Sequence, residues 1–313
     1  MSSSERQDFW TEAFALQGSV TPQIAWQVVG FGLFAAAVVS VDYLAEFYFN
    51  CYIRLEVAPF EIAGAALGLL LILRTNAGYD RWWEARKLWG GIVNQSRNLV
   101  ISALAYGPAN PVWREQWTRW SAVFSHVARC SLRGEKPCGT VTKLVGAEEG
   151  ARIAAAEHMP SYVALQLARL LRQATDEYHL DQFAFMQIDK ERATLIDHIG
   201  ACERILKTPL PVAYSIKIRR FLALFLITLP FALLHQLTSE WVVPLITMMV
   251  AYPLLSLDQI GVELENPFSR DRLNPLPLDN IAATIEGNAM GLLETDAEAG
   301  PDKDVAGNYR QRP

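Results

Sequence analysis

The sequence predicts an all-α membrane protein with four transmembrane helices and a helical cytosolic domain. Hydrophobic residues make up 51% of the 313 residues, and the mean hydropathy is +0.12. The apolar residues are concentrated in long runs without charge, which is typical of membrane spans. Elsewhere they recur with the spacing of a helix face, and strand-like alternation is absent.

The overall charge and the cysteines exclude several classes of protein. With 28 basic and 33 acidic residues the net charge is −5, which argues against a nucleic-acid partner. The cysteines show no paired spacing, so we expect no metal site and no cofactor. They are Cys51, Cys130, Cys138 and Cys202.

The first part of the chain predicts a polar segment followed by a span. Residues 1–23 are polar with embedded aromatics, and they do not form a signal peptide. Residues 24–41 are eighteen residues without a charge, long enough for a first transmembrane helix. Asp42, Glu46 and Arg54 then mark an expected exit loop.

Residues 58–93 are the most informative stretch. Residues 62–73 are uncharged and apolar, and a run rich in arginine and tryptophan follows without proline. We expect one long helix that leaves a membrane and continues into water, with its arginines and tryptophans at the interface. The alternative is a buried core helix with a charged end, because twelve apolar residues are few for a span.

The distribution of basic residues predicts the orientation. The loop after the first span carries one arginine, whereas five basic residues follow the second span. The positive-inside rule therefore predicts that both the N-terminus and the segment from residue 74 onward are cytoplasmic. The five residues are Arg74, Arg81, Arg86, Lys87 and Arg97.

Residues 94–210 predict a soluble helical bundle. Apolar residues from Trp113 to Val127 recur at spacings of three and four, as on one helix face. Further helices are expected at 162–171 and at 181–206. Glycine and proline make 131–157 an expected loop region.

The C-terminal third predicts a membrane hairpin and a strap. Prolines at 209 and 211 break the helical pattern, and the uncharged runs 221–234 and 241–257 follow a basic cluster. Prolines within these runs indicate that the spans pack inside an assembly. Residues 281–293 predict a short helix.

The expected organisation has six segments. They are an N-terminal cytosolic segment (1–23), two spans (24–73), a cytosolic helical domain (74–215), two further spans (216–260), a cytosolic strap (261–293) and a disordered tail (294–313).

The second span contains two rows of residues that share a helix face. Ile62, Ala66 and Leu70 form an apolar row, and Gly64 and Gly68 form a row of small residues. An apolar row around a symmetry axis would make a constriction that gates by dewetting. From the residues alone, ordinary packing against the other spans is the favoured interpretation. No catalytic motif is present.

The central stretch resembles the bestrophin family, in particular its prokaryotic branch. The run Arg74-Thr75-Asn76, Tyr79, Arg81-Trp82-Trp83-Glu84, Arg86 and Trp89-Gly90 carries the resemblance. Two more patches agree in order and distance, namely Thr208-Pro209-Leu210-Pro211 with Tyr214, and Glu265-Asn266-Pro267-Phe268. The similarity extends over about residues 8–290.

This resemblance implies a homopentameric ion channel around one central pore, not an enzyme. Helices of the second span would line a hydrophobic neck, and a cytosolic vestibule would end in an aperture. The location would be the bacterial inner membrane, with both termini cytoplasmic. The expected partners are four further copies of the chain, membrane lipid and permeant monovalent ions.

The family pattern can be carried over to particular positions. The neck would be Ile62, Ala66 and Leu70, with Ala65, Leu69 and Leu73 as the other register. The aperture would be Leu180 or Phe183, at the start of the helix before the third span. Arg74, Arg81, Trp82 and Trp83 are expected interfacial anchors.

The sequence departs from the animal members after Asn266-Pro267-Phe268. Residues 269–274 contain one carboxylate, Asp271, between two arginines, which is a poor Ca²⁺ site. We therefore expect opening without Ca²⁺. The acidic chain favours monovalent cations over anions, and the resemblance to the prokaryotic branch implies the same preference. An anion channel of the same architecture, a membrane-anchored enzyme and a transporter or scaffold remain as alternatives.

Overall fold

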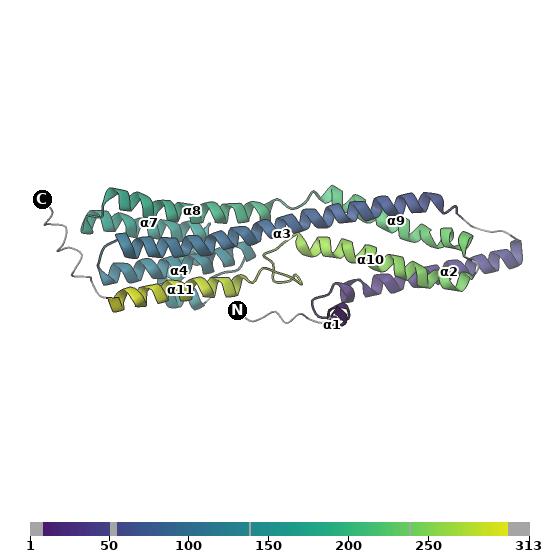
Figure 1. The fold of residues 1–313 in the computed structure, drawn as a ribbon, viewed down its shortest axis with the longest axis horizontal. Coiled ribbons are helices and arrows are strands. Elements are labelled where there is room, and N and C mark those ends of the chain that lie inside the picture. The colour runs from purple at the N-terminus through teal and green to yellow at the C-terminus, as the bar shows by residue number, and fades with distance from the viewer. Residues whose placement is uncertain (1–8, 51–54, 138, 238, 300–313) are drawn as a thin grey trace. The chain divides into compact units, whose positions relative to one another are not determined.

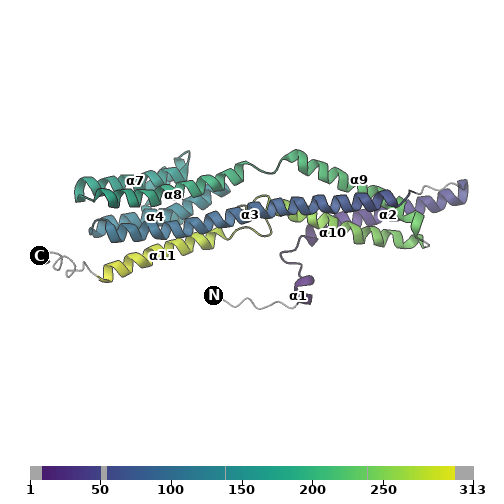
Figure 2. The ribbon, with the colours of Figure 1, turned by 45° about the horizontal axis from the view of Figure 1, so that its top comes forward.

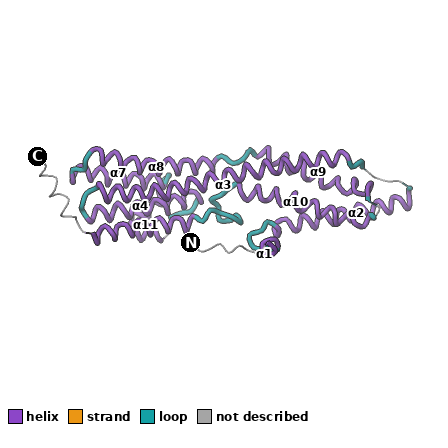
Figure 3. The backbone as a smooth tube through the Cα atoms, viewed as in Figure 1, coloured by secondary structure: helices purple, strands orange, loops and turns teal. Residues whose placement is uncertain are grey.

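The computed structural model describes residues 9–50, 55–137, 139–237 and 239–299. Within these ranges all regular secondary structure is helical, as Figure 3 shows. The chain divides into two compact units. Unit 1 comprises Met1–Trp83 and Pro209–Pro275, and unit 2 comprises Glu84–Thr208 and Leu276–Pro313.

Unit 1 is a bundle of long apolar helices. In Figure 1, α10 runs beside α2, and α9 packs against both. The first part of α3 joins them, because its Leu67 and Leu71 belong to one buried cluster with Leu226 and Ala251. The elements are α1 (Phe9–Ala13), α2 (Thr21–Phe49), α3 (Ala58–Tyr106), α9 (Val212–Gln236), η1 (Glu240–Val242) and α10 (Val243–Leu264).

The predicted single helix across the central stretch is confirmed, since α3 is continuous for 49 residues. The expected exit loop after the first span is wrong, because α2 continues to Phe49 and contains both Asp42 and Glu46. Asp42 is 2% exposed, so its carboxylate is part of the helix packing. The helix ends at Asn50, which adopts the left-handed conformation. Arg54 and Cys51 lie outside the described residues.

Three of the described helices are long and apolar enough to cross a membrane. These are Thr21–Phe49, Ala58–Tyr106 and Glu240–Leu264. The expected count of four spans is not confirmed, because α9 is not among them. Its uncharged run covers only residues 221–234, whereas a span needs about 20 residues. Pro230 and Pro253 both lie inside helices, as the sequence indicated.

Unit 2 is a bundle arranged around α4 (Pro111–Arg133). Figure 2 shows α11 and α7 on α4, and α8 beside α7. The predicted apolar face of α4 is confirmed at Trp113, Trp117, Phe124 and Val127, which are all buried. The other helices are α7 (Met159–Tyr178), α8 (Gln182–Lys207) and α11 (Leu278–Ala299).

Two local predictions for unit 2 are wrong. Residues 131–157 are not a loop region, because α5 (Gly139–Val145) and α6 (Ala147–Ala155) form there. The glycines mark helix ends instead, with Gly134 and Gly146 at positive φ. The helix expected at 281–293 extends from Leu278 to Ala299, so residues 294–299 are helical rather than disordered. Residues 300–313, the rest of the expected tail, lie outside the described residues.

Candidate functional site

In unit 1, one face of α3 packs against the other helices of the bundle. Its buried residues are Leu67, Leu71, Arg74 and Gly78, which recur every three or four positions. Leu67 and Leu71 contact the cluster formed by α9 and α10. This spacing is that of a single helix face, so the orientation of α3 within the unit is fixed by its own sequence.

The opposite face of α3 is apolar and exposed. Ile62 is 75%, Leu69 58% and Leu73 51% exposed, and Ala65 and Ala66 lie between them. No charged residue occurs from Ile62 to Leu73. A continuous apolar face of this kind needs a covering partner or a lipid environment. It is the face that a pore-lining helix would present to other copies of the chain.

The structure separates the two neck registers by exposure. In the first register Ile62 and Ala66 are exposed, whereas Leu70 is partly buried and packs against the bundle cluster. In the second register Ala65, Leu69 and Leu73 are all exposed. In this conformation of the single chain, only the second register keeps all three of its residues on the unpartnered face.

Small residues bring α3 close to its neighbours inside unit 1. A Cβ on Gly64 would lie 3.3 Å from the ring of Phe225, so this glycine packs on α9. A Cβ on Gly78 would lie 3.0 Å from Leu264 Cβ and 3.5 Å from the carbonyl oxygen of Gly261 on α10. Nothing lies within 4 Å of the corresponding position at Gly68. The small-residue row is therefore used partly for packing within the chain.

Close approach of α3 and α10 buries an ion-pair network. Arg74 is 1% exposed and donates to Asp258, and its second Nη lies 3.4 Å from Glu265 Oε1. Arg219 on α9 donates from Nε to the other oxygen of Asp258 at 3.1 Å. One carboxylate thus joins three helices of unit 1. Charge-assisted hydrogen bonds of this kind fix side-chain geometry more firmly than neutral ones.

Sequence reasoning found Arg74 but missed Asp258. The signal was present, because Asp258 is the first charged residue after the uncharged run 241–257. An ionisable residue at such a position is expected to have a partner. The sequence did not show that the partners would come from two other helices, since those lie 39 and 184 positions away.

The other three expected anchors differ in their environment. Arg81 is partly buried and donates from Nη2 to the carbonyl oxygen of Glu265 at 3.4 Å. Trp82 donates from its indole to the carbonyl oxygen of Asn274 at 3.3 Å. Trp83 is 46% exposed and stacks on Tyr79, with ring centroids 6.4 Å apart. Arg81 and Trp82 therefore hold the segment after α10, whereas Trp83 and Tyr79 present an aromatic surface.

The segment after α10 is held by backbone turns. Phe268 is completely buried, and its N–H donates to Asn266 Oδ1 at 3.1 Å. The N–H of Leu273 donates to Glu263 Oε2 at 2.8 Å. Glu263 also accepts a hydrogen bond from Gln259. The carboxylate nearest in sequence to Asp271 on α10 is therefore engaged with protein donors, and Asp271 itself is exposed.

The two aperture candidates lie at the start of α8 in unit 2. Asp181 caps this helix by accepting from the N–H groups of Phe183 and Ala184. Leu180 precedes the cap and is partly buried. Phe183 is 82% exposed in the first turn. Of the two, Phe183 is the one whose side chain is available to line a space outside the chain.

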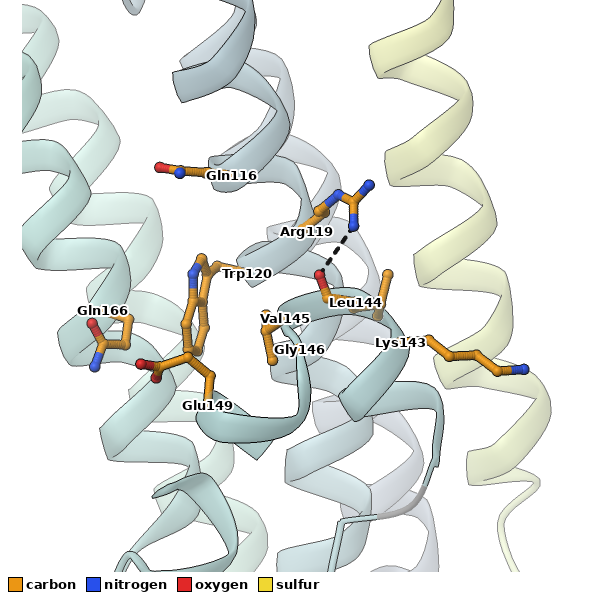
Figure 4. Close-up of a pocket in the computed structure, with 9 residues that line it drawn as sticks. All are labelled: Gln116, Arg119, Trp120, Lys143, Leu144, Val145, Gly146, Glu149 and Gln166. Atoms are coloured by element: carbon orange, nitrogen blue, oxygen red, sulfur yellow. Dashed lines mark hydrogen bonds between the residues drawn. The ribbon is translucent and has the colours of Figure 1, made fainter. Parts of the chain in front are cut away.

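A separate cavity of about 560 Å³ lies in unit 2 (Figure 4). Trp120 and Gln166 face it from α4 and α7, whereas Lys143 points away. Arg119 donates to the carbonyl oxygen of Leu144 at 3.3 Å and to Glu115. None of the expected neck, aperture or anchor residues lines this cavity. The remaining lining residues are Gln116, Val145, Gly146 and Glu149.

A thiol and a carboxyl group of unit 2 have shifted pKa values. Burial raises the pKa of the Cys202 thiol to about 12, and nearby Glu203 and Glu84 act in the same direction. Burial alone would raise the pKa of Glu203, but His158 and Lys207 outweigh it and lower that pKa. His158 Nε2 lies 2.5 Å from Glu203 Oε1. Cys202 is thus an unreactive core thiol, and Glu203 is a carboxylate held in its charged form.

A known family model, Bestrophin_2, described as the bacterial/fungal bestrophin protein, matches residues 1–290 of the chain. The chain belongs to this family. The resemblance carried by the run that begins at Arg74 is thereby confirmed.

Curated relatives of similar length support the same assignment. The voltage-dependent anion channel-forming protein YneE of Escherichia coli (strain K12) is 32% identical over 294 residues, covering 94% of this chain and 93% of YneE. The voltage-dependent anion channel-forming protein sll1024 of Synechocystis is 30% identical over 290 residues, covering 91% and 92%.

A solved structure also matches the bestrophin fold. The crystal structure of a bacterial bestrophin homologue from Klebsiella pneumoniae superposes with a TM-score of 0.79 at 28% identity. The match covers 87% of this chain and 98% of the homologue. The all-helical architecture of this bestrophin therefore follows that of a bacterial member of known structure.

Proposed function

We propose that this bestrophin is a homopentameric ion channel of the bacterial inner membrane, rather than an enzyme. One observation carries the proposal. The exposed face of α3 is uncharged from Ile62 to Leu73, while its other face is fully packed within the chain. Five copies of such a face around an axis would form a hydrophobic neck. The names of the curated relatives as channel-forming proteins support this function.

The neck of this channel is formed by one of two registers of α3. The resemblance to the family favours Ile62, Ala66 and Leu70. The exposure of the side chains favours Ala65, Leu69 and Leu73, because Leu70 packs inward. We place Phe183 at the aperture, since it is the more exposed of the two candidates. Both termini lie on the cytoplasmic side in this proposal. The basic residues that follow the apolar run of α3 support this orientation through the positive-inside rule.

The channel conducts anions in this proposal. The expectation of cation selectivity rested on the net charge of the chain and on its resemblance to the prokaryotic branch, and it finds no support among the relatives, which are named for anion-channel formation. An apolar neck has no fixed charge that could select the sign of an ion. Net charge is a property of the whole surface and not of the pore, which is why it was a weak guide.

Opening is independent of Ca²⁺ in this proposal. Asp271 is exposed and lies between Arg270 and Arg272, and Glu263 is occupied by two protein donors. A Ca²⁺ site needs about six to eight oxygen ligands, and its affinity depends on how many of them are charged carboxylates. Addition of a chelator should leave the conductance unchanged.

The decisive experiment is the reversal potential of the purified pentamer in planar bilayers with asymmetric NaCl. A shift toward the chloride equilibrium potential supports an anion channel. A shift toward the sodium potential would restore the cation channel that the charge of the chain favoured. A well-formed pentamer without current under any voltage would contradict the channel itself.

A further inference from the structure

Unit 1 contains a groove of about 400 Å³ that is separate from the exposed face of α3. Three helices form it, namely α2, α9 and α10. None of the neck, aperture or anchor residues lines it. Its lining residues are Gln27, Phe31, Arg219, Leu222, Ala223, Leu226, Leu255, Asp258 and Gln259.

The groove is polar at one end and apolar at the other. Gln27 on α2, Arg219 on α9, and Asp258 and Gln259 on α10 form the polar end, and the Asp258 carboxylate is paired with Arg74 and Arg219. About one turn further along each helix, the lining becomes Phe31, Ala223 and Leu255. The change from polar to apolar runs toward the C-terminus along α2 and α9 and toward the N-terminus along α10. The three helices therefore pass from polar to apolar at one common level.

The polar end carries unused hydrogen-bond donors. Arg219 is 52% exposed and uses Nε for Asp258, and its two Nη groups have no other protein partner among the described residues. The exposed amide of Gln27 likewise has no protein partner in the part of the chain that the structure describes. Lys217 and Arg220 are exposed beside Arg219. A guanidinium and an amide converging at one point suit a phosphate group.

The apolar end suits a hydrocarbon chain. Leu226 is completely buried and Leu222 is 4% exposed, so they form a closed floor. Phe31 and Leu255 are partly buried side walls. A free phosphate would use only the polar end and leave this apolar surface uncovered. A ligand with a charged head and an apolar tail covers both ends.

We propose that the groove binds one anionic phospholipid, with its phosphate on Arg219 and Gln27 and the first part of an acyl chain on Phe31, Leu226 and Leu255. Basic pockets between membrane helices on the cytoplasmic side are typical sites for such headgroups. The inference requires unit 1 to lie in a membrane, as the proposed function does, but it does not require conduction. Binding measured without current therefore separates failure of this inference from failure of the channel.

The test is native mass spectrometry of the full-length oligomer, titrated with phosphatidylglycerol or phosphatidylcholine. Wild-type protein should retain phosphatidylglycerol in preference to phosphatidylcholine. Arg219→Gln should weaken phosphatidylglycerol binding about five-fold, because one basic contact near a headgroup is lost. Arg220→Gln is the matched control, because this substitution removes the same charge one position away. Arg220 does not line the groove. It should leave the preference unchanged.

Two further variants keep the test independent of the Arg219–Asp258 pair. Gln27→Leu removes a donor that has no protein partner among the described residues, so the fold should be unaffected while phosphatidylglycerol binding weakens. Phe31→Trp narrows the apolar end and should weaken both lipids. Equal retention of phosphatidylglycerol by the wild type, Arg219→Gln and Phe31→Trp would overturn the proposal.

Two other occupants give distinct results. Displacement of phosphatidylglycerol by an equal concentration of inorganic phosphate would mean that the polar end binds free phosphate, which overturns a lipid site. If Phe31→Trp changes the number of copies in the oligomer and leaves lipid retention unchanged, the groove is an interface between copies, which also overturns it.

Discussion

The two halves of α3 show how one helix can serve two different environments. In unit 1 its outward residues are apolar, such as Ile62 and Leu69, and its inward face includes the buried Arg74. In unit 2 its outward residues include Arg86 and Arg97, and its inward face is mainly apolar, with Trp89, Ile92 and Leu99 buried beside Ser96. The outward face therefore changes from apolar to charged along one continuous helix, whereas the inward face stays largely apolar.

The difference shows which apolar surface of α3 is covered within the chain and which is left uncovered. The second half follows the pattern of a water-soluble helix, with apolar residues inside and charges outside. The first half leaves an apolar face uncovered, which is stable only against lipid or further copies of the chain. Its buried charges are matched within unit 1 by Asp258. Experiments that alter each half should therefore act on different properties.

The largest effect is expected at the carboxylate that joins the helices of unit 1. Asp258→Asn removes the charge that pairs with both Arg74 and Arg219. Removal of one partner from a buried ion pair costs about 3–5 kcal/mol, because the other charge remains buried. The thermal midpoint of the oligomer, followed by size-exclusion chromatography after heating, should fall markedly.

The matched control is an ion pair on the surface of unit 2. Arg172 and Asp176 are both more than half exposed and pair at 2.9 Å within α7. Asp176→Asn should leave the thermal midpoint essentially unchanged, because solvent screens an exposed pair. If both variants had equal midpoints, the network at Asp258 would contribute no more than a surface pair.

The next comparison concerns two adjacent leucines of α3. Leu70 packs against the core cluster of unit 1, whereas Leu69 is 58% exposed. Leu70→Ala should cost about 1–3 kcal/mol of stability, less than a fully buried leucine, with little direct effect on unitary current. Leu69→Ala should instead raise the unitary current by widening the neck. Single-channel recording and thermal midpoints measure the two effects separately.

The opposite outcome would favour the register that the family resemblance suggested. If Leu70→Ala raised the unitary current and Leu69→Ala did not, the neck would be Ile62, Ala66 and Leu70. Leu70 would then have to turn from the bundle toward the axis in the assembled channel.

Glycines in unit 2 offer a pair with opposite expected signs. A Cβ on Gly91 would lie 2.7 Å from the ring of His198, so Gly91→Ala requires that ring to shift. Overpacking of this kind costs about 1–3 kcal/mol. Gly200 lies inside α8 and nothing is within 4 Å of its Cβ position. Gly200→Ala should stabilise by about 0.5–1 kcal/mol through helix propensity. Thermal midpoints of the two variants should therefore move in opposite directions.

The sequence predicted the fold well where the pattern is local. The continuity of α3, the apolar face of α4 and the proline break before α9 all follow from residues within one or two helical turns. The misplaced end of α2 has a clear cause. Asp42 and Glu46 were interpreted as solvent residues, but Asp42 is buried among other helices. A charged residue does not by itself mark the end of a membrane helix, because the sequence does not show whether other helices bury it.

The candidate site was predictable in kind but not in detail. Helical periodicity identified α3 as the central element and the row Ile62, Ala66 and Leu70, whereas the neck and its second register came from the family resemblance. The resemblance favoured the first register, and the sequence did not show which leucine meets α9 and α10. Asp258 was missed for the same reason, as its partners lie on two distant helices. Cation selectivity finds no support in the names of the relatives, and net charge does not report the charge near a pore.

The smallest expected effect tests a charged pair of unit 2 through its pH dependence. His158 and Lys207 lower the pKa of Glu203 despite its burial. A carboxyl whose pKa is lowered by folding stabilises the protein above its unfolded pKa of about 4.3. That contribution is lost as the pH falls through the lower, folded-state pKa. Glu203→Gln should therefore reduce stability near pH 7, by less than about 1 kcal/mol because solvent screens the pair.

The pH profile distinguishes this pair from a general effect of charge. The difference in thermal midpoint between wild type and Glu203→Gln should shrink as the pH is lowered below about 4, because the wild-type carboxyl is then protonated as well. Glu157→Gln removes the same charge from an exposed residue near His158, and its midpoint should match the wild type throughout. A constant difference across the whole range for Glu203→Gln would mean that the variant acts through packing. In that case the packing of the Glu203 side chain, and not its charge, would stabilise unit 2 at this position. Packing is also what we expect to determine the effect of Gly91→Ala.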